Sequence, residues 1–258
     1  FTVRQRAYTG LRMSLSPQKR ILVALDTPDL DTAVALATQL RGLVGGYKVG
    51  LEVCTAVGVP QIVSAIAGVG GNLFLDLKLH DIPNTVAGAV RAACQLGPAV
   101  QMLTLHCLGG RDMLRAAVAA AHSMSYRPLL LGVTVLTSLD ATALANELQV
   151  KPSLTDYVVH LARMAQDCGL DGVVASPHEV AAIRAACPHV RIITPGIRPS
   201  WATEGDQRRV MTPLDALRSG ADYLVIGRPI TNPPSAIGDP AIAAARIVSE
   251  LEQYNHNV

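Results

Sequence analysis

The strongest constraint on the fold is a unit that repeats from Ile21 onward: a short apolar strand, a turn and an amphipathic helix. Apolar runs of this length predict buried parallel strands, and the segments between them have helical periodicity. The expected strands are 21–25, 47–49, 73–77, 102–105, 129–135, 172–174, 191–194 and 223–226. The expected helices are 30–40, 53–69, 85–96, 111–122, 154–168, 177–186, 213–219 and 239–251. Eight such units predict an α/β protein, a single-domain (β/α)8 TIM barrel.

An open, doubly wound parallel sheet is the alternative architecture for such a pattern. Its dinucleotide-binding form requires Gly-x-Gly-x-x-Gly after the first strand, but Asp-Thr-Pro-Asp stands there, at 26–29. No linker or change of composition divides the chain, so residues 13–258 are expected to form one catalytic domain. Residues 1–12 do not follow the pattern and lack the apolar core of a secretory signal. We expect them to come from cloning or from an upstream start, with an organelle transit peptide as the alternative.

Composition excludes several classes of partner. The formal net charge is only +2, which gives no electrostatic reason to bind nucleic acid or an anionic membrane. No apolar segment is long enough to span a bilayer. The five cysteines are scattered without a Cys-x-x-Cys pair, which favours a reducing, cytoplasmic location and indicates no zinc site. No His or Cys pair has metal-ligand spacing either, so we expect no metal ion.

Clustered charge at 76–85, Asp-Leu-Lys-Leu-His-Asp-Ile-Pro-Asn-Thr, is the strongest local signal. Side chains two apart on a strand share a face, so Asp76 and Lys78 are expected to project together. Asp81 follows just beyond the strand, before a turn at Ile82-Pro83. Two explanations are open, namely a structural ion-pair network at a barrel rim and a catalytic Asp-Lys-Asp array. Because barrels keep their working residues at the C-terminal strand ends, we favour the catalytic array.

Polar residues also end other predicted strands. Asp26 ends the first strand, where a helix cap or turn residue is the alternative explanation. Lys48 lies in a strand too apolar for a solvated lysine and therefore needs an acidic partner. Thr137 follows the fifth strand, where a hydroxyl residue can also simply begin a loop.

The region around the last two strands is basic. Arg198 and Gln207 lie in the long segment after the seventh strand, and either a ligand site or a solvated basic loop explains them. Gly227 and Arg228 end the eighth strand. Barrels commonly bind phosphate between the loops after strands seven and eight, where a glycine admits a close backbone approach and an arginine grips two oxygens.

The string at 76–85 resembles the signature of the orotidine 5'-monophosphate (OMP) decarboxylase family. Further motifs occur in that family's order between residues 21 and 230, at 24–26 (Ala-Leu-Asp), 47–50 (Tyr-Lys-Val-Gly), 133–138 (Val-Thr-Val-Leu-Thr-Ser), 194–199 (Thr-Pro-Gly-Ile-Arg-Pro), 205–209 (Gly-Asp-Gln-Arg-Arg) and 225–230 (Val-Ile-Gly-Arg-Pro-Ile). The chain departs from the family at Leu79, where Phe is frequent, and at 107–108, where Cys-Leu follows a histidine.

The resemblance implies conversion of OMP to UMP and carbon dioxide, in pyrimidine biosynthesis, without a cofactor. It implies that Lys78 is the proton donor and that Asp76 and Asp81 complete its charge array. It also implies a homodimer in which Asp81 and Thr85 reach the neighbouring site. The remaining substrate contacts that it implies are Asp26 and Lys48 to the ribose, Thr137 to the pyrimidine, and Arg198, Gln207, Gly227 and Arg228, the last three at the phosphate.

Two other functions remain as alternatives. A sugar-phosphate decarboxylase or aldolase on the same barrel has a similar Asp-x-Lys-x-x-Asp but uses magnesium and lacks the Ile-Pro-Asn-Thr found at 82–85. A non-catalytic nucleotide-binding protein would have lost one of the catalytic charges, and all of them are present here.

Overall fold

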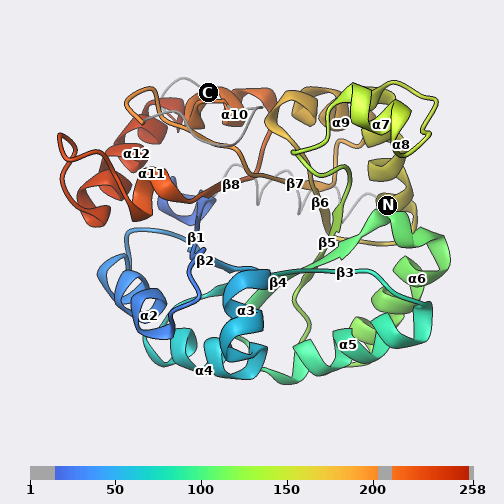
Figure 1. Cartoon of the computed structure of the whole chain (residues 1–258), viewed down its shortest axis with the longest axis horizontal. Coiled ribbons are helices and arrows are strands. Elements are labelled where there is room, and N and C mark those ends of the chain that lie inside the picture. Colours follow the sequence, from blue (N-terminus) through green and yellow to red (C-terminus); the bar gives the residue numbers. More distant parts are fainter. Residues whose placement is uncertain (1–14, 203–210, 256–258) are drawn as a thin grey trace.

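Eight parallel strands close into a barrel in chain order, each hydrogen-bonded to the next and β8 to β1 (Figure 1). The computed structural model describes residues 15–202 and 211–255. The predicted (β/α)8 barrel is therefore confirmed, while the expectation for residues 1–12 lies outside the described residues. The strands are β1 Ile21–Ala24, β2 Gly46–Val49, β3 Leu73–Leu79, β4 Val100–His106, β5 Leu129–Val133, β6 Gly172–Val174, β7 Arg191–Thr194 and β8 Tyr223–Ile226.

Helices form a ring outside the strands (Figure 1). The α-helices are α2 Leu30–Gln39, α3 Leu51–Val57, α4 Val59–Gly68, α5 Pro83–Gln95, α6 Gly110–His122, α7 Ala141–Asn146, α8 Leu154–Asp167, α9 Val180–Ala186, α10 Pro213–Ser219, α11 Arg228–Thr231 and α12 Pro240–Asn255. Three short 3₁₀ helices are η1 Gln18–Arg20, η2 Cys107–Gly109 and η3 Pro177–Glu179. The short helices α7 and α11 were not predicted, because each has too few residues to show a helical period.

The helix predicted at 53–69 is wrong as one element. It is two helices, α3 and α4, bent by 102° at Gly58, whose φ of 85° is one that residues with a Cβ rarely adopt. A proline in the first turn of α4 fits the new start. Among the described residues no single helix is long and apolar enough to cross a membrane, although this bent pair passes that test by length and composition together.

Two layers of apolar side chains hold the barrel together. The larger layer lies between the strands and the helices, and includes β-strand residues such as Ile21, Val23 and Leu75, all fully buried. A smaller cluster fills the barrel interior and consists of Leu22, Ala24, Phe74, Met102, Leu131, Ile193 and Val225. These alternate along the strands with the outward residues, as the two-residue period of a strand requires. Because the interior is packed, the barrel is a rigid support and not a pore.

Two carboxylates, one partly and one fully buried, join the starts of neighbouring strands at the N-terminal end. Asp171, just before β6, accepts hydrogen bonds from both terminal nitrogens of Arg127, at 2.7 and 3.0 Å, and from the Leu130 amide at 2.9 Å. The hydrogen bonds from Arg127 to Asp171 raise the pKa of Arg127. Asp222, just before β8, accepts in the same way from Arg184 and from the Ile192 amide. We infer that the ion pairs and hydrogen bonds of Asp171 and Asp222 stabilise the fold, because barrels place their catalytic residues at the other end.

We expect Asp171→Asn to lower the free energy of unfolding by about 1.5–3 kcal/mol, the range for hydrogen bonds to a charged group. Urea denaturation followed by circular dichroism measures the change. The matched control is Asp167→Asn, since Asp167 forms a 3.4 Å pair with Arg111 in which both side chains are about half exposed. Such surface pairs contribute little, so the control should change stability by less than about 0.5 kcal/mol. Equal losses in the two variants would contradict the structural role of Asp171.

Candidate active site

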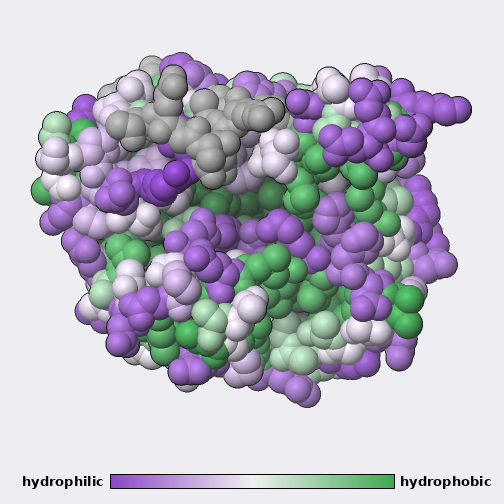
Figure 2. Space-filling view, in the orientation of Figure 1, coloured by the Kyte–Doolittle hydropathy of each residue, from purple (hydrophilic) through white to green (hydrophobic). Residues whose placement is uncertain are grey.

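A cavity of about 430 Å³ opens at the C-terminal ends of the strands. Figure 2 shows it as a hollow near the centre of this face, with hydrophobic residues in its depth and hydrophilic ones along its edges. Phe74, from the barrel interior, contributes to its floor. Eight of the residues predicted from the sequence line it: Asp26, Lys48, Asp76, Lys78, Thr137, Arg198, Gly227 and Arg228.

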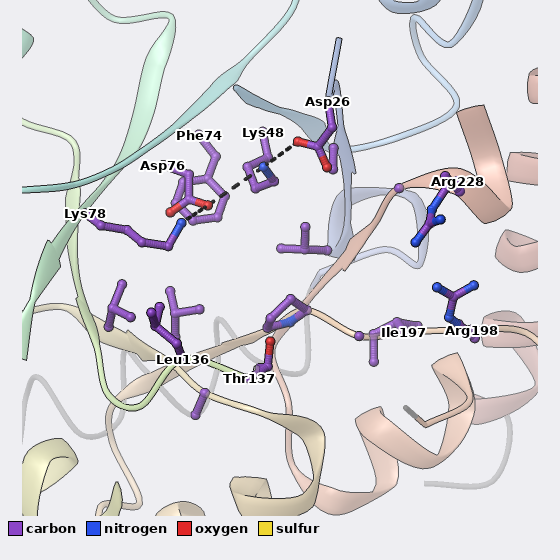
Figure 3. A pocket seen from close by; sticks show the side chains of 18 of the residues that line it. Asp26, Lys48, Phe74, Asp76, Lys78, Leu136, Thr137, Ile197, Arg198 and Arg228 are labelled. Atoms are coloured by element: carbon purple, nitrogen blue, oxygen red, sulfur yellow. Dashed lines mark hydrogen bonds and ion pairs between the residues drawn. The ribbon is translucent and has the colours of Figure 1, made fainter. Parts of the chain in front are cut away.

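Charged side chains from β2, from β3 and from the segment that follows β1 form a continuous array along one wall (Figure 3). Lys78 Nζ donates to Asp76 Oδ2 at 2.8 Å. Lys48 Nζ lies 3.8 Å from the same oxygen and donates to Asp26 Oδ1 at 3.0 Å. The Lys48 side chain is only 13% exposed. Asp26 and Asp76 are the acidic partners that a lysine in this apolar strand was predicted to require. The array alternates in sign along its length, which stabilises the charges of Lys48, Asp76 and Lys78 against desolvation, while Asp26 is exposed.

Lys78 reaches the cavity through an irregularity in its strand. Its φ is 49°, in the left-handed region. The pairing of β3 with β4 runs from Leu75↔Leu103 to Leu79↔Leu105, so β3 has extra residues between two ladder positions. Asp76 and Lys78 do lie together, as predicted, but the regular alternation used to predict it does not continue through Lys78. Such bulges re-aim side chains next to functional sites.

Two arginines lie at the opposite end of the cavity from Lys78 (Figure 3). Arg198 follows β7, and its amide donates to the carbonyl of Met211 at 2.9 Å, which pins the start of the long segment to its end. Arg228 begins α11 directly after β8, with Gly227 before it. Thr137 lines the cavity on the side that faces the lysine array. The cavity therefore has one wall of paired charges and a basic end that suits an anion.

Asp81 and Thr85 are not among the residues that line the cavity of this chain. Both are exposed, and Asp81 Oδ1 accepts a hydrogen bond from the neighbouring Ile82 amide at 2.6 Å. Within residues 15–202 and 211–255, no ion pair includes Asp81. Gln207 lies outside the described residues. The roles of these three residues, like those of the eight that line the cavity, therefore remain predictions.

Comparison with known proteins identifies the family. The model of the orotidine 5'-phosphate decarboxylase / HUMPS family matches residues 19–247. The chain belongs to this family. It is 51% identical over 251 residues to the orotidine 5'-phosphate decarboxylase of Moorella thermoacetica, covering 95% of this chain and 97% of that one. It is 49% identical over 237 residues to that of Paramagnetospirillum magneticum, covering 90% and 97%.

Solved structures agree with this result. The barrel superposes on an orotidine 5'-phosphate decarboxylase from Lactobacillus acidophilus with a TM-score of 0.76 and 32% identity, covering 92% of this chain and 99% of the other. An uncharacterised conserved protein from Geobacillus kaustophilus superposes with a TM-score of 0.74 and 35% identity, covering 89% and 99%. The barrel that the sequence pattern predicts is thus shared with solved members of the decarboxylase family.

Two histidines stand beside the array of this family member. His80 and His106, from the ends of β3 and β4, stack with ring centroids 5.3 Å apart. Burial lowers the pKa of His106, and His80 and Lys78 lower it further. No group of three or more His, Cys, Asp or Glu side chains is arranged to bind a metal in the part of the chain that the structure describes.

One polar residue at the array was not predicted from the sequence. Thr104, in the middle of β4, is fully buried and hydrogen-bonded to both Asp76 and the Lys78 backbone. A threonine inside an apolar strand reads as an ordinary β-branched strand residue. The one signal in the sequence is its position: Thr104 lies two residues before His106, on the strand that pairs with the charged strand β3.

Proposed function

We propose that this protein decarboxylates OMP to UMP and carbon dioxide in de novo pyrimidine biosynthesis, without a metal or an organic cofactor. The observation that carries the proposal is the Lys78 ammonium, 2.8 Å from Asp76, in a cavity whose other end is lined by two arginines. Relatives about half identical to this chain are named for the same activity.

The proposed chemistry needs a cation at one carbon atom. When the bond between ring carbon 6 and the carboxylate breaks, its electron pair stays on carbon 6 and carbon dioxide leaves. The Lys78 ammonium stabilises that developing negative charge and then donates a proton to the same carbon. Asp76 favours the charged form of the lysine before the reaction, because an opposite charge nearby offsets desolvation. It also lies close to the substrate carboxylate, a like charge that leaves as the reaction proceeds.

The rest of the cavity binds the nucleotide. Asp26 and Lys48 contact the ribose hydroxyls, and Thr137 contacts the pyrimidine. Arg198, Arg228 and the Gly227 backbone provide donors at the basic end for the phosphate and neighbouring polar groups, with Gln207 as a further phosphate contact. Because the phosphate is remote from the bond that breaks, its binding energy can lower the barrier only by positioning the reacting end against Lys78.

A decarboxylation assay after exhaustive chelation tests this function. The wild-type protein should release carbon dioxide from OMP at an undiminished rate, whereas a magnesium-dependent relative would lose activity.

Lys78→Ala should lower turnover by at least about 10⁴-fold, since it removes both the proton donor and the cation. The variant should still bind UMP in a titration, because the basic end is intact. Near-normal turnover by folded Lys78→Ala would refute the assigned role of the lysine.

Arg228→Ala should weaken UMP binding by about 1.5–3 kcal/mol, the range for a hydrogen bond to a charged group. Isothermal titration measures the loss. Uridine, which has no phosphate, should bind the variant and the wild type equally. The control variant is Arg218→Ala, because Arg218 lies on α10 with an exposed side chain, away from the cavity lining. A variant that binds UMP normally but uridine poorly would place Arg228 at the wrong end of the ligand.

The homodimer belongs to the same proposal. Leu51, Ile82 and Leu108 are 45–66% exposed and follow the C-terminal ends of the adjacent strands β2, β3 and β4. Exposed apolar residues gathered along one rim favour a protein interface. Asp81 and Thr85 stand on that rim, outside their own cavity. A two-fold contact there would carry them to the partner's site.

We also propose a cytoplasmic location, consistent with five cysteines that are all free and buried.

Mixing two inactive variants tests the shared site. Lys78→Ala and Asp81→Ala homodimers should each be impaired at both sites. After subunit exchange, half of the dimers are mixed, and one site in each mixed dimer combines an intact Lys78 with an intact Asp81. Roughly one quarter of all sites should therefore recover, as a two-fold interface requires. Activity of the mixture is compared with the mean of the separate variants, with exchange followed by tagged subunits. No gain despite complete exchange would mean that Asp81 acts within its own chain.

A further inference from the structure

The bulge that presents Lys78 leaves one backbone donor without its usual ladder partner. Pairing between β3 and β4 lapses between Leu75 and Leu79, and Lys78 lies inside this gap with a φ of 49°. A buried amide without a partner costs about as much as a lost hydrogen bond. Here the Lys78 amide donates to the side chain of Thr104, at 2.8 Å from its Oγ1. A side chain of β4 thus replaces the backbone carbonyl that a regular strand would supply.

The same hydroxyl also fixes the catalytic carboxylate. Thr104 Oγ1 donates to Asp76 Oδ1 at 3.0 Å. A hydroxyl carries one donor and two acceptor positions, so it can accept from Lys78 and donate to Asp76 together. With Oδ1 occupied by Thr104, the other oxygen, Oδ2, faces both lysine ammoniums, at 2.8 Å from Lys78 and 3.8 Å from Lys48. Thr104 is fully buried and is not among the residues that line the cavity.

We propose that Thr104 is a positioning residue for the decarboxylation, a role that rests on the function proposed above. Its hydroxyl fixes the left-handed backbone of Lys78 and the orientation of Asp76 together, so that the proton donor and its counter-ion keep one geometry. It touches neither the cavity nor the basic end, so it acts on the substrate only through these two residues. Removing it leaves a buried amide and a carboxylate oxygen each short of a partner and frees the carboxylate to turn.

Thr104→Val tests this role, because valine has the shape of threonine without the hydroxyl. We expect kcat for OMP to fall roughly 10–100-fold, the scale for a small misplacement of a reacting group. KM and UMP affinity should stay within about threefold, since the nucleotide contacts are untouched. Thr104→Ser should restore kcat to within about threefold of wild type. Alanine and serine are close in size and differ by one hydroxyl. If the valine variant does not fold, the ratio of kcat between Thr104→Ser and Thr104→Ala therefore tests the role of the hydroxyl.

A matched control separates positioning from general packing. Thr134 is also fully buried just after a strand, and its hydroxyl donates to the Val174 carbonyl at 3.1 Å and not to a residue of the array. Thr134→Val should therefore leave kcat within about twofold of wild type. A loss of kcat in Thr134→Val as large as that in Thr104→Val would overturn the proposal.

A double-mutant cycle with Asp76→Asn shows whether Thr104 acts through the carboxylate. Single-turnover rates with excess enzyme give the four values. If Thr104 positions Asp76, the penalty of Thr104→Val should shrink at least about threefold in the Asp76→Asn background. An unchanged penalty, or a wild-type kcat in Thr104→Val or Thr104→Ala, would overturn the proposal. Absence of decarboxylation by the wild-type protein itself would instead reject the proposed function, so the two failures are distinguishable.

Discussion

One carboxylate, that of Asp76, joins three neighbouring strands at the end of the barrel where the cavity opens. Its oxygens meet an ammonium from β2, an ammonium from β3 and a hydroxyl from β4. A buried charge is tolerated only when it is paired and fully hydrogen-bonded, and here each partner comes from a different strand. The positions of Lys48 and Lys78 therefore depend on the register of the barrel, and the barrel must close correctly before the array exists.

The two ends of the barrel differ in role: one holds the strands together and the other forms the cavity. At the N-terminal end Asp171 and Asp222 clamp strand starts to arginines that lie far from the cavity. At the C-terminal end the carboxylates instead face lysines whose ammoniums line an open cavity. Between them Phe74 and the interior cluster fill the barrel. A rigid, separately stabilised support lets the cavity end keep a strained residue such as Lys78, whose left-handed backbone would otherwise relax.

The sequence predicts the strands better than the details of the site, for physical reasons. Apolar runs identify all eight strands because parallel strands covered on both faces must be apolar. The prediction misses the break at Gly58 because apolar periodicity continues through it, although Gly58 followed by Pro60 is a helix stop and start signal in the sequence. Strand alternation predicts that Asp76 and Lys78 lie together, but in the structure a bulge brings Lys78 to Asp76, and that bulge leaves no mark in composition. Thr104 escapes for the same reason, since its partners are set by the register of two strands.

In the proposed reaction, the charges of the array explain how two lysines and two carboxylates that balance one another can favour loss of a neutral product. Asp26, Lys48, Asp76 and Lys78 carry two negative and two positive charges, which sum to zero when the cavity is empty. The proposed substrate adds a carboxylate close to Asp76, which is a like-charge contact. Carbon dioxide carries no charge, so this repulsion disappears along the reaction while the attraction between Lys78 and carbon 6 grows. Both changes favour the transition state over the bound substrate, which is the condition for raising kcat. The geometry that matters is thus the fixed position of Asp76 between the lysines, since a carboxylate free to turn would relieve the repulsion before the bond breaks.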